Sequence, residues 1–80
     1  MAEDEQQTQT PEAMISDHEL AEKITLARLE AGLTQSDLAS LMQTSQSVVA
    51  RWETGGRIPS ITTLDRLAEV TGKRLEVRLV

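Results

Sequence analysis

Cysteine is absent from this 80-residue chain, so neither a disulfide framework nor a thiolate metal site can be built. Phenylalanine and tyrosine are absent too, and a single tryptophan is the only large aromatic residue. The core must therefore come from Leu, Ile, Val, Met and Ala, a set that suits packed helices. No apolar run approaches the roughly 20 residues that span a bilayer, and the acidic start is unlike a signal peptide, so we expect a cytoplasmic protein with no membrane partner.

Groups for catalysis are equally scarce. His18 is the single histidine, and it lacks further ligands of suitable type for a metal ion nearby. The segment "TGGR" lacks the spacing and the following lysine of a phosphate-binding loop. The Ser and Thr residues have no base to activate them apart from His18. We therefore expect no enzymatic activity, no metal and no cofactor.

Negative charge is concentrated at the start of the chain. The formal net charge is −5, but residues 1–15 hold four acids and no base, which leaves nine acids and eight bases, or −1, for residues 16–80. Residues 1–15 offer too little apolar surface to offset the entropy of ordering them, so a disordered acidic tail is predicted. Three interpretations of this tail remain open: terminal disorder, a solubility aid, or a segment that folds on a protein partner. Residues 16–80 are expected to form one domain.

Four helices are predicted within residues 16–72. Residues 16–19 and 34–37 form capping boxes, and Ser45 and Ser60 can each cap a further helix. Glycines that tolerate a left-handed backbone are expected to end the first, third and fourth helices. Apolar residues recur between these signals at three- and four-residue spacing. The residues predicted to face the core are Leu20, Ile24, Ala27, Leu38, Ala39, Leu41, Met42, Val49, Trp52, Ile61, Leu64, Leu67 and Ala68.

The period changes to two in "RLEVRLV", residues 74–80, where apolar and charged residues alternate. Such a pattern predicts a β-strand, with Leu75, Val77 and Leu79 on one face. A lone strand has no partner in a chain that is otherwise helical. The predicted fold is therefore mainly α, with four or five helices and a C-terminal strand that requires a partner.

The second and third predicted helices, joined by only a few residues, have the arrangement of a helix-turn-helix unit. In such a unit the second helix lies in the major groove of DNA. Its outward residues here are Gln46, Ser47, Ala50 and Arg51. Gln can bond adenine N6 and N7, and Arg can fork onto guanine O6 and N7, while Ala permits close approach. The alternative is an ordinary surface helix, since many carry Gln, Ser and Arg.

The order of residues in "GLTQSDLASLMQTSQSVVARWETGGRIPS" resembles the helix-turn-helix of the xenobiotic-response-element class, the phage-repressor-like DNA-binding domains. That resemblance covers most of residues 24–70. It implies that Gln46, Ser47, Ala50 and Arg51 read bases. It also implies contacts to the DNA backbone from Thr34, Gln35, Thr44, Ser45 and Arg57. Arg28 and Glu53 match a pair that forms a buried salt bridge in such repressors; two unconnected surface charges are the alternative.

Phage repressors usually continue into a fifth helix, whereas "TGKRLEVRLV" resembles the C-terminal strand of antitoxins of the HigA and HipB types. That resemblance implies a homodimer in which the strands pair across the two-fold axis, bound to an inverted-repeat operator in double-stranded DNA. It further implies a toxin partner, a RelE- or HigB-like ribonuclease or, as the alternative, a HipA-like kinase. Two other functions remain open: a regulator of the same class with no toxin, and a protein-binding factor that keeps the fold without DNA affinity.

Overall fold

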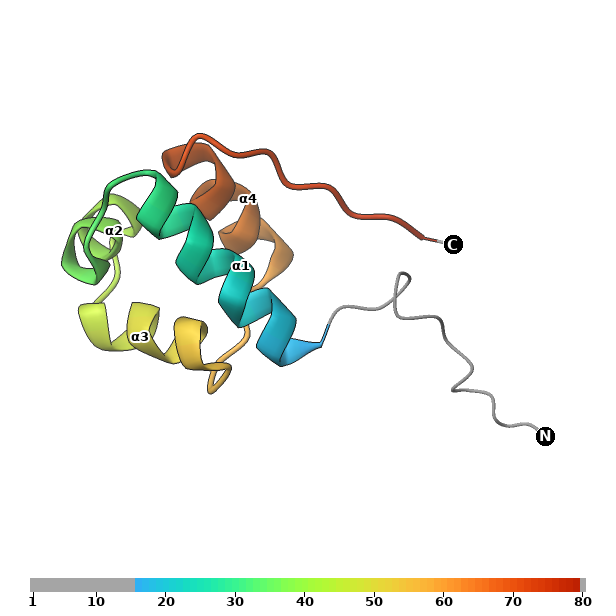
Figure 1. The fold of residues 1–80 in the computed structure, drawn as a ribbon, viewed down its shortest axis with the longest axis horizontal. Coiled ribbons are helices and arrows are strands. Elements are labelled where there is room, and N and C mark those ends of the chain that lie inside the picture. Colours follow the sequence, from blue (N-terminus) through green and yellow to red (C-terminus); the bar gives the residue numbers. More distant parts are fainter. Residues whose placement is uncertain (1–15, 80) are drawn as a thin grey trace.

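The computed structural model describes residues 16–79, which form four helices (Figure 1). They are α1 (Asp17–Glu30), α2 (Gln35–Met42), α3 (Gln46–Thr54) and α4 (Ile61–Val70). Residues 16–79 contain no paired strand, and residues 73–79 leave α4 as an extended chain. The fold is therefore mainly α, with four helices. The tail predicted for residues 1–15 lies outside the described residues.

Each helix begins at a side chain that satisfies free backbone N–H groups. The Ser16 hydroxyl accepts from the Glu19 N–H at 3.1 Å, and the Glu19 carboxylate accepts from the Ser16 N–H at 2.9 Å. Thr34 and Asp37 repeat this reciprocal pair at the start of α2. Serine residues cap α3 and α4 in the same way, without the acidic partner. Because such caps fix where a helix starts, they also fix the short spacing between α2 and α3.

The helices end at residues with a left-handed or near-helical backbone. Gly55 ends α3 at φ +81°, a conformation that glycine adopts without strain from a Cβ atom. α2 ends instead at Gln43, whose φ of +57° is the only positive φ of a non-glycine residue in the described part of the chain. The turn between α2 and α3 is therefore made without a glycine.

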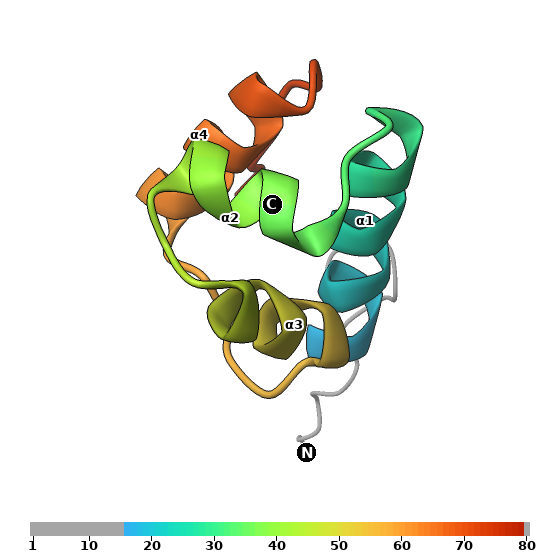
Figure 2. The same ribbon diagram turned by 90° about the vertical axis from the view of Figure 1, so that its left-hand side faces the viewer.

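The core lies where the four helices meet, and Figure 2 shows α1, α2, α3 and α4 arranged around it. Leu38 and Val49 are fully buried, and Ile24, Trp52 and Leu67 pack around them. These five residues come from all four helices. The core thus ties the two elements of the helix-turn-helix to both flanking helices.

Two of the residues predicted to face the core do not. Leu41 is 46% exposed, because α2 turns Leu38, Ala39 and Met42 inward and leaves Leu41 at the edge of that stripe. Ile61 is 58% exposed, because it lies in the first turn of α4 and lines an open groove beside α1 rather than the core. Both predictions were wrong for one reason: in a short helix, apolar spacing alone does not decide which apolar residue the neighbouring helices reach.

Candidate nucleic-acid interface

The helices α2 and α3 are joined by residues 43–45, and α3 lies along one side of the molecule (Figure 2). Val49 and Trp52 hold α3 against the core. The opposite side of α3 carries polar residues and faces solvent, as expected for a helix with a single apolar stripe. The four residues predicted to read bases lie away from the core: Gln46, Ser47 and Arg51 are exposed, and Ala50 is half-buried.

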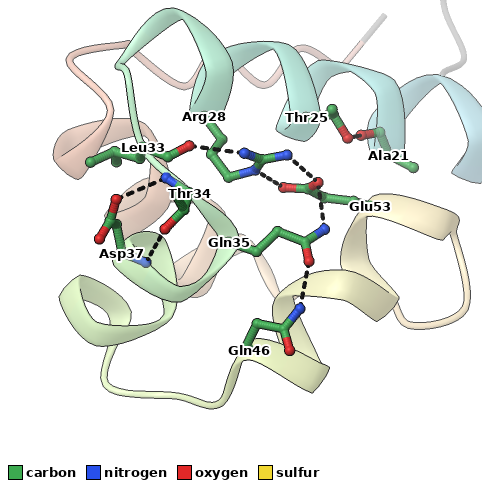
Figure 3. Close-up of polar contacts among 9 residues, drawn as sticks. All are labelled: Ala21, Thr25, Arg28, Leu33, Thr34, Gln35, Asp37, Gln46 and Glu53. Atoms are coloured by element: carbon green, nitrogen blue, oxygen red, sulfur yellow. Dashed lines mark hydrogen bonds and ion pairs between the residues drawn. The ribbon is translucent and has the colours of Figure 1, made fainter.

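A chain of side-chain hydrogen bonds connects this outer side to the interior (Figure 3). The Gln46 amide Nε2 donates to Gln35 Oε1 at 2.7 Å, and Gln35 Nε2 donates to Glu53 Oε1 at 3.1 Å. The first residue of α2 is thereby connected to the first residue of α3. The structure thus places Gln35 and Gln46 in direct contact.

Glu53 is the inner end of this chain, and it forms a two-pronged ion pair with Arg28 of α1. Arg28 Nε donates to Glu53 Oε2 at 2.7 Å, and an Arg28 terminal nitrogen donates to Glu53 Oε1 at 3.0 Å. A further guanidinium nitrogen donates to the Leu33 carbonyl at 2.8 Å. The two side chains are only 12% and 5% exposed. The pair therefore fastens α1 to α3 below the outward-facing residues.

The ion pair also decides the charge state of Glu53. Burial raises the pKa of the Glu53 carboxyl, but the hydrogen bonds from Arg28 and Gln35 and the charge of Arg28 outweigh this, so the pKa lies below its ordinary value. The hydrogen bond to Glu53 raises the pKa of Arg28. Both groups are therefore charged at neutral pH.

The charged state of Glu53 fixes which way two amide groups point. A carboxylate only accepts hydrogen bonds, so Gln35 must turn its NH2 group to Glu53 and its oxygen to Gln46. Gln46 in turn uses one N–H on Gln35. Its Oε1 and its second N–H then remain for a ligand. These are the acceptor and the donor that the edge of an adenine requires.

The residues predicted to contact the DNA backbone lie around α3. Thr34 and Ser45 are the exposed caps of α2 and α3, and their hydroxyls accept from Asp37 N–H and Val48 N–H. Thr44 is half-buried in the turn. Arg57 is exposed in the loop after α3. The structure therefore brings them to the ends of α2 and α3, next to the base-reading set.

Electrostatics favour an anionic partner at this face although the whole chain carries −5. The single acid of α3 is Glu53, whose charge is buried and compensated by Arg28. The solvent-exposed charge of α3 is therefore that of Arg51, and Arg57 adds a second positive charge nearby in the sequence. Free N–H groups at the start of α3 contribute a partial positive charge as well.

Sequence reasoning did not find the hydrogen bond between Gln35 and Glu53, which lie 18 residues apart. It also missed Gln43, which takes the left-handed conformation in the turn with no glycine to mark it. No pattern of residue types indicates either feature. Both depend on how α2 and α3 pack.

Other kinds of site find no support in the part of the chain that the structure describes. Within residues 16–79 no three side chains of His, Cys, Asp or Glu gather as metal ligands would. None of the four described helices has the length and apolar character needed to cross a membrane.

Comparison with known proteins bears on the same region. The family model described as "Helix-turn-helix" matches residues 24–77, which is well over half of the chain. The match includes α2, the turn and α3. No curated protein matches the sequence.

Proposed function

The chain belongs to the helix-turn-helix family of the xenobiotic-response-element class, and from this membership we propose that it is a sequence-specific transcriptional repressor. The family match indicates a DNA-binding transcription regulator. The observation that supports base reading here is the exposed side of α3, where Gln46 and Arg51 face solvent above a buried ion pair. The protein acts by binding, with no catalytic step.

In this proposal α3 enters the major groove. The Gln46 amide offers its remaining N–H to adenine N7 and its oxygen to the adenine N6 amino group. Arg51, one to two helical turns further on, forks onto guanine O6 and N7. Ser47 can bond either base, and Ala50 lets the helix approach closely.

Backbone contacts set the position of α3 in the groove. The starts of α2 and α3 present N–H groups to phosphates, and Thr34, Thr44 and Ser45 add hydroxyls there. The Gln35 amide is already engaged with Glu53 and Gln46, so this residue would contact phosphate through its backbone N–H and its second amide N–H. Arg57 supplies a charge from the following loop.

We further propose a homodimer in which Leu75, Val77 and Leu79 lie in paired C-terminal strands. One helix-turn-helix reads too few bases for strong discrimination, and two basic residues attract phosphate only modestly. A two-fold dimer sets two reading helices roughly 34 Å apart on one face of the duplex. Its operator is therefore an inverted repeat.

The repressor fits an antitoxin of the HigA type that also represses its own operon. Two features of the sequence support this: the alternating segment 74–80 and the four acids of residues 1–15, which suit a basic ribonuclease of the RelE or HigB type. A HipA-like kinase is the alternative toxin, and a regulator with no toxin is the alternative function. Co-purification of a toxin with the full chain supports the antitoxin, whereas its absence with intact operator binding supports the stand-alone regulator.

Selection of operators from a random duplex library tests DNA reading directly. The wild-type chain should enrich an inverted repeat and lose affinity with rising salt. Arg51→Ala should cost about 1–3 kcal/mol of binding free energy and relax one base position in each half-site. Ser40→Ala, an exposed change on α2 away from the groove beside α1, is the control and should leave both unchanged. An unaltered ratio of operator to random binding in Arg51→Ala would contradict base reading by this residue.

A further inference from the structure

The last described residues form an apolar edge with no partner. The final backbone hydrogen bond runs from the Lys73 N–H to the Ala68 carbonyl at 2.7 Å, and none involves residues 74–79 in the described part of the chain. Val77 is 59% exposed and Leu79 is 98% exposed. Unpaired backbone groups beside exposed apolar side chains form a template for a further strand.

An apolar groove lies next to this edge. Its walls are α1, α4 and residues 73–78, which turn back past α1 after the end of α4 (Figure 1). Leu26 of α1 and Ile61 of α4 line it, and they are 55% and 58% exposed. The exposed side chains of helices and segment are thus neighbours on one face of the molecule.

We propose that a second copy of this chain covers this face, and that the two C-terminal segments pair antiparallel with the two-fold axis at Val77. In such a pair residue i lies opposite residue 154 − i of the partner chain. Val77 then faces its own copy, and Leu75 faces Leu79 on the same apolar side. On the other side Glu76 lies directly opposite Arg78, and the symmetry repeats this pair.

The pairing of charges favours this register over the neighbouring registers. An axis at Glu76 would set Glu76 opposite Glu76 and Arg74 opposite Arg78, and like charges directly opposite one another are destabilising. An axis at Arg78 would oppose two arginines. An axis at Leu75 keeps a favourable pair of Arg74 with Glu76, but it sets Lys73 opposite Val77.

Axes that lie between two residues are excluded by the pleat. They would set an apolar residue opposite a charged one at the axis itself, because a slip of one residue moves each side chain to the other face. An axis at Leu79 leaves only the last residues overlapping. Over residues 75–79 the register at Val77 is thus the one that keeps one apolar face, one charged face and opposite charges in contact, and its mismatch of Arg74 with Val80 falls at the ends of the pair.

The groove explains how a ribbon of two short strands could persist. An isolated two-stranded ribbon is marginally stable in water, so it needs an apolar surface beneath it. With the axis at Val77, the apolar side of the ribbon can rest on the exposed side chains of α1 and α4 in both copies. The charged side, with its Glu76–Arg78 pairs, then faces solvent.

This inference rests on the homodimer of the proposed function and adds its register and the surface that it covers. DNA reading by α3 uses none of these residues. The pairing can therefore fail while base reading stands, and base reading can fail while the pairing stands.

Single cysteines test the register in the full chain, which has no cysteine of its own. Residues directly opposite in an antiparallel pair have Cα atoms roughly 4.5–5.5 Å apart, a distance that a disulfide spans. Val77→Cys should cross-link to its own copy under mild oxidation, at least about tenfold faster than Leu75→Cys, Leu79→Cys or the exposed control Ser40→Cys. A mixture of Leu75→Cys and Leu79→Cys chains should cross-link to each other.

Charge reversal tests the same register without a covalent bond. Glu76→Arg alone, or Arg78→Glu alone, makes both cross-strand pairs repulsive and should weaken the dimer about tenfold at low salt, measured by sedimentation. The double variant E76R/R78E restores opposite charges and should return most of this loss. A double variant as weak as the two single variants would overturn the register.

Other outcomes of these experiments would contradict the proposed register. Self cross-linking of Leu75→Cys instead of Val77→Cys moves the axis and overturns the proposal. A wild-type chain that sediments as a monomer, or a dimer in which none of the cysteines of the segment cross-links, overturns the proposal as well. Gel shifts with the same variants measure DNA binding independently, so a failure of the pairing can be distinguished from a failure of base reading.

Discussion

At the scale of single residues, Arg28 and Glu53 differ from surface charges because each requires a partner of opposite charge. Their charges are almost fully buried, so each needs the other. Arg28→Ala leaves the Glu53 carboxylate without its cation and should lower the free energy of unfolding by about 3 kcal/mol, measured in urea. The double variant R28A/E53Q removes the orphaned charge and should regain part of the loss. Equal stability of Arg28→Ala and wild type would show that the pair contributes nothing.

The same pair makes stability depend on pH. The pKa of Glu53 is lowered in the folded chain from its ordinary value of 4.5, so its contribution is complete above that value and is lost as pH falls through the folded pKa. Hydrogen bonds from the backbone and hydroxyl of Thr34 lower the pKa of Asp37 in the same direction. Urea unfolding from pH 7 to pH 3 should show a plateau and then a decline below about pH 4.5.

Two variants separate these contributions. Glu53→Gln should have a shallower acid decline than wild type, because it has no carboxylate to protonate at this site. Asp37→Asn should remove only the part that belongs to the cap of α2. An acid decline in Glu53→Gln as steep as that of wild type would assign the effect to other carboxyl groups.

At the scale of elements, the end of α3 offers a matched pair of glycines. Gly55 has φ +81°, whereas the adjacent Gly56 has no left-handed φ. A Cβ atom on Gly55 would have room, since its nearest atom is the Asp17 carbonyl oxygen at 3.8 Å, so the cost of Gly55→Ala is backbone strain alone. That variant should lose about 1 kcal/mol, while Gly56→Ala should be neutral or slightly stabilising. Thermal unfolding of both variants would expose the contrast, and equal losses would contradict it.

The starts of the helices were predictable because capping is local chemistry. Ser16, Thr34, Ser45 and Ser60 each bond a backbone N–H three residues ahead, and each marks a helix start predicted from sequence. Packing was less predictable. Leu41 has the spacing of a core residue, but its exposure depends on which stripe of α2 the other helices meet.

The polar network under α3 shows a second limit of sequence reasoning. The motif identifies Gln35 and Gln46 as candidate DNA contacts, but it does not show that Glu53 orients both amides. That relation joins residues from two helices and requires side-chain positions. A segment such as 74–79 poses the opposite problem, because its pairing depends on a partner that a single chain does not contain.

In the whole molecule, the two proposed surfaces lie on different elements. The base-reading face lies on α3, while the dimer face lies on α1, α4 and residues 73–79, and Figure 1 shows α3 and the C-terminal segment on opposite sides of the helical core. No residue belongs to both surfaces. Loss of the dimer should therefore leave each reading helix intact and affect only how two of them act together.

Removal of residues 74–80 tests this separation. The shortened chain should keep its helical circular dichroism, since the buried core lies between Ala21 and Thr71, and it should sediment as a monomer. Because two linked half-sites bind with a high effective concentration, affinity for the inverted repeat should fall about 100-fold or more. Affinity for a duplex with one half-site should stay unchanged.

A charge-matched control distinguishes dimer loss from lost electrostatic attraction, because the deletion also removes two arginines and one glutamate. Changing Leu75, Val77 and Leu79 to serine keeps the length and every charge, and it should reproduce the monomer and the loss on the inverted repeat. A serine variant that stays dimeric, or a deletion variant that binds one half-site and the full repeat with the same loss, would assign the effect to charge. In that case, the apolar side of the segment would have no part in assembling the repressor.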